Sequence, residues 1–288
     1  MNPSSRDVTG CISRLFVYPV KSCAGVEVQE ALLLETGLEF DRAWMVVDEA
    51  GDFVTQRVLP RMALIKPQLK TFEMVLRAPG MLALHIALDA VEQPTRVRVW
   101  DDVVSAYDMG AVAAQWFSDF LGQKLRMVRF DPEHQRLSSL KWTGGIEAPV
   151  QFNDSYALLV TSDASLDGLN TRRQAANHAP AGMERFRPNL VLSGVQAHDE
   201  DRLGVMHITT EQGQAQIKPV KPCVRCPIPN IDPLSGISSP EVGDALQTYR
   251  QDPRMNGGIT FGMNAIVLQG AEQMLRVGQT VVADYVFD

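Results

Sequence analysis

Lys221-Pro222-Cys223-Val224-Arg225-Cys226-Pro227 contains two of the four cysteines of the chain, separated by two residues, with an arginine between them. A thiolate is a soft metal ligand and a strong nucleophile, and a neighbouring guanidinium favours the thiolate over the thiol. The stretch therefore predicts chemistry at one of its sulfur atoms. Which chemistry this is depends on the residues that the fold brings to the same place.

The cysteine pair has four possible explanations. A zinc site commonly takes four ligands from two CxxC or His pairs, and the other cysteines, Cys11 and Cys23, are twelve residues apart and form no such pair. A thioredoxin-type redox pair begins a helix, whereas Pro227-Ile228-Pro229 would break one at once. Two inert loop thiols would leave Arg225 unexplained. The residues favour the fourth explanation, one thiolate that acts as a metal ligand or nucleophile.

Length and composition are those of an ordinary globular protein of one large domain or two smaller ones. The 288 residues are 45% hydrophobic and 21% charged, and 27 Lys+Arg against 34 Asp+Glu give a net charge of -7. This balance argues against nucleic acid as the main partner, but it allows one small anion held by a local basic cluster.

The location expected from the sequence is cytoplasmic, without a membrane partner. No apolar run approaches the roughly 20 residues of a membrane span. The polar start, Met1 to Asp7, is followed by no apolar segment of a secretory signal. Four cysteines are also too few for a disulfide scaffold in a chain of 288 residues.

Strand-like patterns dominate the first hundred residues. They cover residues 12–17, 26–34, 43–48 with 53–55 after a turn, and 95–100 with 103–107 after another turn. The first clear helix is expected from about Ala111 to Leu121, with Gly122 as its stop. Residues 131–149 are polar, with scattered Pro, Gly and Ser. We therefore expect one domain over residues 1–130 and a second over 131–288.

Short strands also prevail in the second part. They are expected at residues 156–160, 189–193, 205–209, 215–220, 265–268 and 280–286. Ser162 is expected to cap a helix over residues 163–173, and Ser239-Pro240-Glu241 to begin another with proline in its first turn. Many short strands with few helices predict a strand-rich α+β fold with barrel-like, mostly antiparallel sheets.

Three basic motifs lie outside the cysteine stretch. The arginines of Arg185-Phe186-Arg187-Pro188-Asn189 offer forked donors to a phosphate or another oxyanion. The segment from Tyr18 to Gly25 turns from a strand end into a loop with a lysine and a hydroxyl, and Asp41-Arg42-Ala43-Trp44 opens a strand. Each motif alone is compatible with solvated arginines or an ordinary ion pair. Together they indicate an anion site.

These motifs resemble those of MOSC-domain proteins in order and approximate separation. The matching segments are Tyr18-Pro19-Val20-Lys21-Ser22, Asp41-Arg42-Ala43-Trp44, Arg187-Pro188-Asn189 and the cysteine stretch. The chain is most similar to the subgroup with an N-terminal β-barrel domain, which includes bacterial YcbX-type proteins and the mitochondrial amidoxime-reducing component. The resemblance covers nearly the whole chain. It implies a mostly antiparallel, β-barrel-like MOSC domain preceded by a β-rich N-terminal MOSC domain with a few short helices.

The resemblance also implies a cofactor and its site residues. Family members bind a molybdenum cofactor, Mo-molybdopterin, through a cysteine thiolate, and they reduce N-hydroxylated compounds. Carried over by position, Cys226 is the metal ligand, and Arg225 beside it is the second catalytic residue. The cofactor-binding positions are Lys21, Ser22 and Arg42 for the pterin phosphate, with Ser155, Arg187, Asn189, Val224 and Arg225.

Two departures from the family pattern affect the expected shape of the substrate entrance more than the expected metal site. Tyr156 stands where the family has the second residue of a small hydroxyl-bearing pair. Pro227-Ile228-Pro229-Asn230 stands where many members have an Ile/Leu-Thr-Thr run. Because a pterin dithiolene supplies two sulfur ligands, one protein cysteine suffices and no larger ligand cluster is needed.

Two functions from different classes follow. The first is reduction of a small N-hydroxylated substrate, with Asp199 and Asp232 as loose candidates for proton delivery. Its electrons would come from a separate ferredoxin- or cytochrome-type protein, because the chain has no C-x4-C-x2-C run of a fused ferredoxin domain. The alternative is a carrier of the cofactor or a sulfur relay with a persulfide on Cys223 or Cys226. A zinc-stapled binding module would leave the basic motifs unexplained.

Overall fold

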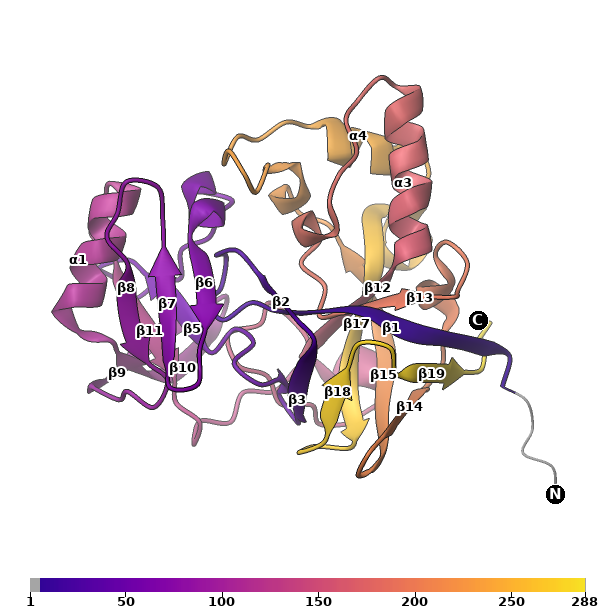
Figure 1. The fold of residues 1–288 in the computed structure, drawn as a ribbon, viewed down its shortest axis with the longest axis horizontal. Coiled ribbons are helices and arrows are strands. Elements are labelled where there is room, and N and C mark those ends of the chain that lie inside the picture. Colours follow the sequence, from indigo (N-terminus) through magenta and orange to yellow (C-terminus); the bar gives the residue numbers. More distant parts are fainter. Residues whose placement is uncertain (1–5, 288) are drawn as a thin grey trace.

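The computed structural model describes residues 6–287, so residues 1–5 of the polar start and the last residue lie outside it. Figure 1 shows two lobes side by side, one with α1 and β5 to β11, the other with a barrel beneath α3 and α4. The predicted strand-rich α+β fold is confirmed, since residues 6–287 form nineteen strands and four α-helices.

A closed barrel forms the centre of the second lobe. Its strands follow the order β12 (Leu158–Ser162), β13 (Leu190–Ser193), β1 (Val8–Val17), β19 (Thr280–Ala283), β14 (Met206–Thr210), β15 (Gly213–Val224) and β17 (Gly258–Gln269). The last strand, β17, pairs back to β12, and every pair is antiparallel except β12 with β13. Closure leaves the ring without an open edge. Its interior is packed with buried aliphatic side chains, among them Ile12, Leu15, Val160, Leu190 and Ile217.

Smaller sheets and the helices complete the fold. In the first lobe the sheet orders are β5 (Trp44–Val47), β11 (Arg126–Phe130), β10 (Asp102–Asp108), β9 (Gln93–Val99), and β6 (Lys66–Leu69), β7 (Glu73–Arg77), β8 (Leu84–Ala87). Beside the barrel lie β18 (Met274–Arg276), β3 (Glu30–Leu34) and β4 (Gly37–Leu38), with β2 (Val26–Val28) on β1 and β16 (Gln251–Asp252) on β17. The α-helices are α1 (Gly110–Leu121), α2 (Leu140–Thr143), α3 (Asp163–Ala175) and α4 (Glu241–Gln247). The 3-10 helices are η1 (Pro60–Leu64), η2 (Met183–Arg185), η3 (Asp199–Arg202), η4 (Ile228–Asn230) and η5 (Pro253–Met255).

The sequence signals for a hairpin turn, a helix end and a helix cap are confirmed. The β9–β10 hairpin forms in register, with Asp102 opposite Val99. Gly122 ends α1 in the left-handed conformation at φ 76°, and the Ser162 hydroxyl caps α3 by accepting from the Ser165 amide. By contrast, the prediction of one strand over residues 26–34 is wrong. β2 and β3 there pair with different partners, β1 and β18.

The first strand belongs to the second lobe. β1 lies between β13 and β19, so its hydrogen bonds join the start of the described chain to strands near its end. The expected domain boundary between residues 130 and 131 stays a prediction, and the barrel contains strands from both sides of it. As a consequence the loop that follows β1 emerges between the two lobes, where the basic motifs meet.

Buried Glu200 ties η3 to the start of α3. Its two carboxylate oxygens accept hydrogen bonds from the hydroxyls of Ser162, at 2.9 Å, and Ser165, at 2.7 Å. Ser165 Oγ in turn accepts from the His198 amide. Burial without a cationic partner among these contacts raises the pKa of Glu200 to about 7.

This burial predicts a pH-dependent stability. Because the folded-state pKa lies above the unfolded one, the contribution of Glu200 is full below its unfolded pKa and is lost as the pH rises through about 7. Between pH 5 and pH 8 the wild type should lose up to about 3 kcal/mol of unfolding free energy relative to Glu200→Gln. Urea unfolding at several pH values measures the difference. Exposed Glu147→Gln is the control, and parallel pH profiles for wild type and Glu200→Gln would contradict the expectation.

Candidate functional site

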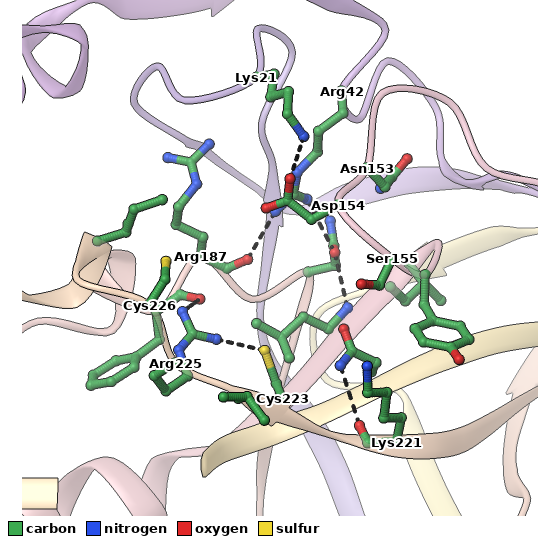
Figure 2. Close-up of a pocket in the computed structure, with 18 of the residues that line it drawn as sticks. Lys21, Arg42, Asn153, Asp154, Ser155, Arg187, Lys221, Cys223, Arg225 and Cys226 are labelled. Carbon is green, nitrogen blue, oxygen red and sulfur yellow. Dashed lines mark hydrogen bonds and ion pairs between the residues drawn. The ribbon is translucent and has the colours of Figure 1, made fainter. Parts of the chain in front are cut away.

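A cationic cavity of about 310 Å³ lies between the two lobes and is lined by residues from both. Its positively charged lining residues are Lys21, Arg42, Arg57, Arg187, Lys221 and Arg225. Asp154 is the one carboxylate among the described residues that line it. Figure 2 shows five of these cations and Asp154 coming from several segments, with the cysteine stretch along one side; the five are Lys21, Arg42, Arg187, Lys221 and Arg225. In a chain with a net charge of -7, six cations around one carboxylate mark an anion site.

Three residues of the cavity lining, two of them arginines, have strained backbone conformations. Ser22, Arg42 and Arg187 have φ angles of 69°, 53° and 59°, in the left-handed region that side chains other than glycine rarely adopt. Such a conformation costs about 1 kcal/mol or more and persists only where the surroundings impose it. Here the Lys21 amide donates to Trp44 O at 2.8 Å and the Arg42 amide to Tyr18 O at 2.8 Å, so the two N-terminal loops hold each other.

Lys21 is the buried cation at the centre of this lobe junction. The residue is 4% exposed, and its Nζ donates to Phe152 O and to Asp154 Oδ1, each at 2.6 Å. Desolvation lowers the pKa of Lys21, while the carboxylate of Asp154 acts in the opposite direction. Both partners of this lysine thus come from residues 152–154, the segment that precedes β12.

Arg42 and Arg187 lie against the same aromatic ring. Their guanidinium carbons are 4.4 Å and 4.2 Å from the ring centre of Tyr18. Arg42 is neutralised by Asp41 at 2.5 Å, whereas Arg187 Nη1 donates to Cys23 O at 2.6 Å. Burial, together with the charge of Arg42, lowers the pKa of Arg187 to about 10. Its Nη2 is buried without a hydrogen-bond partner, so one forked donor is left for a ligand.

The Asn189 side chain is already saturated by the protein. Its Oδ1 accepts from the Leu159 amide at 3.1 Å and from Arg42 Nη1 at 3.2 Å, and its Nδ2 donates to Phe16 O at 3.2 Å. The residue is 1% exposed. Although Asn189 lines the cavity, its contacts make it the residue that fixes Arg42 against the barrel.

The cysteine stretch ends a barrel strand and turns beside the cavity. Cys223 is at the penultimate position of β15, and Cys226 follows in the turn before η4, so the pair does not begin an α-helix. Arg225 Nη1 donates to Cys223 Sγ at 2.9 Å, and Arg225 Nη2 donates to Phe186 O at 2.8 Å. The guanidinium is therefore directed at Cys223. Both cysteines are half-buried and both line the cavity, but only Cys223 receives this hydrogen bond.

The structure brings all the sequence-predicted site residues to one cavity. The lining includes Lys21, Ser22, Arg42, Ser155, Arg187, Asn189, Val224, Arg225 and Cys226. The two loose proton-donor candidates lie elsewhere: Asp199 is held by Tyr285 and Arg202, and Asp232 pairs with Arg185. Neither aspartate lines the cavity.

Among the lining residues that sequence reasoning did not assign to the site are Arg57, Trp100, Asp154 and Lys221. Asp154 and Lys221 are chain neighbours of predicted residues, and that adjacency was the available signal. Arg57 and Trp100 stand in the first lobe without any motif around them. Trp100 occupies the β9–β10 turn with a φ of 57°, and no pattern in the sequence marks it as a site residue.

These residues fit a phosphate-bearing, metal-containing cofactor. The unpartnered buried Nη2 of Arg187 and the surplus of cations suit a phosphate. A soft thiol, Cys226, lies in the same cavity. Within residues 6–287 there is no group of three or more His, Cys, Asp or Glu that could hold a metal ion by itself. Over the same residues, no helix has the length and apolar character needed to cross a membrane.

The saturation of Asn189 predicts a structural effect. Asn189→Ala should lower the free energy of unfolding by roughly 2–4 kcal/mol, because it leaves the buried Leu159 amide and Phe16 carbonyl unpaired. Exposed Ser155→Ala, at the same cavity, should leave it within about 0.5 kcal/mol. Urea denaturation checks both. Equal effects of the two changes would show that Asn189 does not brace the site.

Comparisons with known proteins match this architecture. Residues 9–124 match the MOSC N-terminal beta barrel domain, and residues 147–282 match the MOSC domain. The chain is 35% identical over 251 residues to mitochondrial amidoxime-reducing component 1 of Mus musculus, covering 84% of this chain and 72% of that protein. It is 34% identical, with the same coverage, to mitochondrial amidoxime reducing component 2 of Homo sapiens.

A longer relative matches more of the chain. Molybdenum cofactor sulfurase of Homo sapiens is 28% identical over 288 residues, which cover 94% of this chain and 32% of that protein. The two domain matches and the relatives at 34–35% identity agree with the motifs gathered at the cavity. The chain belongs to the MOSC-domain family, in the group that carries an N-terminal MOSC β-barrel domain.

Proposed function

We propose that this protein binds a molybdenum cofactor in the cationic cavity and reduces N-hydroxylated compounds. The observation that carries the proposal is the meeting of the six cations with the thiol of Cys226 in one cavity. The names of the relatives, amidoxime-reducing components and a molybdenum cofactor sulfurase, support the same choice of cofactor and reaction. We also propose a cytoplasmic location.

Different residues of the chain would contact different parts of the cofactor. Lys21, Ser22, Arg42 and Arg187 would hold the phosphate, and Cys226 would be the metal ligand. Ser155, Val224 and Arg225 would contact the cofactor along the cavity wall. When bound, the cofactor would supply two-electron redox chemistry and a metal able to accept oxygen.

The reaction needs electrons and protons from outside the cavity. Reduction of an N–OH group to N–H consumes two electrons and two protons and releases water. Although desolvation opposes it, the ammonium of Lys21 holds the pKa of Asp154 well below its usual range, so this carboxylate is no proton store. Protons would reach the substrate from solvent, and a separate ferredoxin- or cytochrome-type protein would supply the electrons.

Metal content tests the cofactor assignment. Wild-type protein from a host that makes the pterin should contain molybdenum near one atom per chain, whereas Cys226→Ala should lose it almost entirely. Cys223→Ala should keep most of the metal, because its thiol is engaged by Arg225 rather than free. Elemental analysis measures all three, and equal loss in both variants would overturn the assignment to Cys226.

Turnover tests the reaction. The loaded wild type, supplied with a chemical reductant, should convert an N-hydroxylated amidine to the amidine, as followed by chromatography. The metal-free Cys226→Ala protein is the control. A loaded wild type that leaves the N–O bond intact would contradict the reductase and favour the second candidate.

The second candidate is a cofactor carrier or sulfur relay. Arg225 donates to Cys223 Sγ at 2.9 Å, so a guanidinium would lie beside a thiolate formed at that position. Such a thiolate would take the outer sulfur of a persulfide donor and release the donor's thiolate, leaving a persulfide on Cys223. Mass spectrometry after exposure to a small-molecule persulfide would find this extra sulfur on the wild type and not on Cys223→Ala. Equal labelling of both proteins would contradict the relay.

A further inference from the structure

Asp154 is a negatively charged side chain that lies in the anion site of its own protein. Its Oδ1 accepts from Lys21 Nζ at 2.6 Å and from Trp100 Nε1 at 3.2 Å. The guanidinium of Arg57 adds a second positive charge to that of Lys21, and it lies 4.7 Å from the ring centre of Trp100. Two donors and a guanidinium from the first lobe thus converge on one carboxylate from the second.

The carboxylate is free to leave, but the lysine is not. The side chain of Asp154 is 53% exposed, whereas that of Lys21 is 6% exposed. Lys21 also donates to Phe152 O, so its ammonium stays anchored if Asp154 turns away. Figure 2 shows the Asp154 carboxylate next to the Lys21 ammonium, on the same side of the cavity as Arg42.

Charge balance gives a reason for this arrangement. A buried ammonium without a partner costs several kcal/mol, and the other cations of the cavity make that cost higher. Asp154 offsets it in the protein without ligand, which keeps Lys21 charged and in place. A phosphate carries up to two negative charges and several acceptor oxygens, so it can replace one carboxylate at the same donors.

We infer that Asp154 is a resident counter-ion of the anion cavity, which competes with an incoming phosphate group for Lys21, and that Arg57 and Trp100 belong to this device. Arg57 adds attraction for the phosphate, and Trp100 positions the carboxylate through its indole N–H. Trp100 has a left-handed φ of 57°, and its ring lies against that of Phe53 at a centroid distance of 5.0 Å. The phosphate is that of the cofactor in the proposed function, and inorganic phosphate shares its chemistry.

Phosphate binding by the full chain from a host unable to make the pterin tests the inference. By calorimetry, Asp154→Asn should bind inorganic phosphate at least about tenfold more tightly than the wild type, because the competing charge is gone. Asp52→Asn is the matched control, since Asp52 is 42% exposed and paired with Arg98 but does not line the cavity. Arg57→Gln should weaken binding severalfold. Equal or weaker binding by Asp154→Asn, or no phosphate binding in any variant, would overturn the inference.

Fluorescence gives a readout that does not depend on the stability of Asp154→Asn. If phosphate displaces Asp154, the indole N–H of Trp100 loses its partner, and titration of the wild type should change the tryptophan emission. Trp100→Phe should abolish that change while still binding phosphate. An emission change that survives in Trp100→Phe, or none in the wild type at saturating phosphate, would argue against displacement.

The outcomes separate this inference from the proposed function. Tighter phosphate binding by Asp154→Asn, in a protein that never retains molybdenum, would support the counter-ion role of Asp154 and contradict the proposed cofactor. Molybdenum retained by the wild type, together with unchanged phosphate affinity in Asp154→Asn, would support the proposed cofactor and contradict the counter-ion role of Asp154.

Discussion

Repulsion among cations held in one cavity is the constraint on which the site depends. Arg42 and Arg187 share the ring of Tyr18, and Lys21 is buried a short distance along the same loops. Like charges at such separations destabilise one another by an amount that grows as water is excluded. The fold offsets this with Asp41 on one side and Asp154 on the other. What remains is a surplus of positive charge that an anionic ligand can satisfy.

The two-lobed architecture supplies the means of holding these charges. β1 is a strand of the barrel wall, between β13 and β19. The loop that follows it places Lys21 beside β5 of the first lobe, where the Lys21 amide donates to Trp44 O. Asn189, just before β13, ties Arg42 to the barrel. Neither lobe contains the cavity alone. A change that loosens the contact between the lobes should therefore disturb the anion site before it disturbs either core.

The two cysteines differ in their position on the barrel and in their hydrogen-bond partners. Both cysteines line the cavity, but Cys223 belongs to a barrel strand and receives a hydrogen bond from Arg225, whereas Cys226 lies in the turn after that strand. The two thiols therefore have different hydrogen-bond partners in spite of their proximity in sequence. A thiol without such a partner in a cation-rich cavity suits a cofactor that brings its own sulfur ligands and a phosphate.

The sequence by itself determined the strand-rich class, the end of α1 at Gly122, the cap of α3 at Ser162, and the family to which the motifs belong. These features depend on short stretches in which side-chain chemistry and backbone preference act locally. It also indicated the lining residues that sit within motifs. Only the tertiary structure decided that Asn189 is saturated, that Arg225 is directed at Cys223, and that Trp100 and Asp154 meet Lys21. Apart from Arg225 and Cys223, which are two positions apart, those contacts join residues tens to more than a hundred positions apart. The pairing of these distant residues is fixed by barrel closure and lobe packing rather than by local pattern.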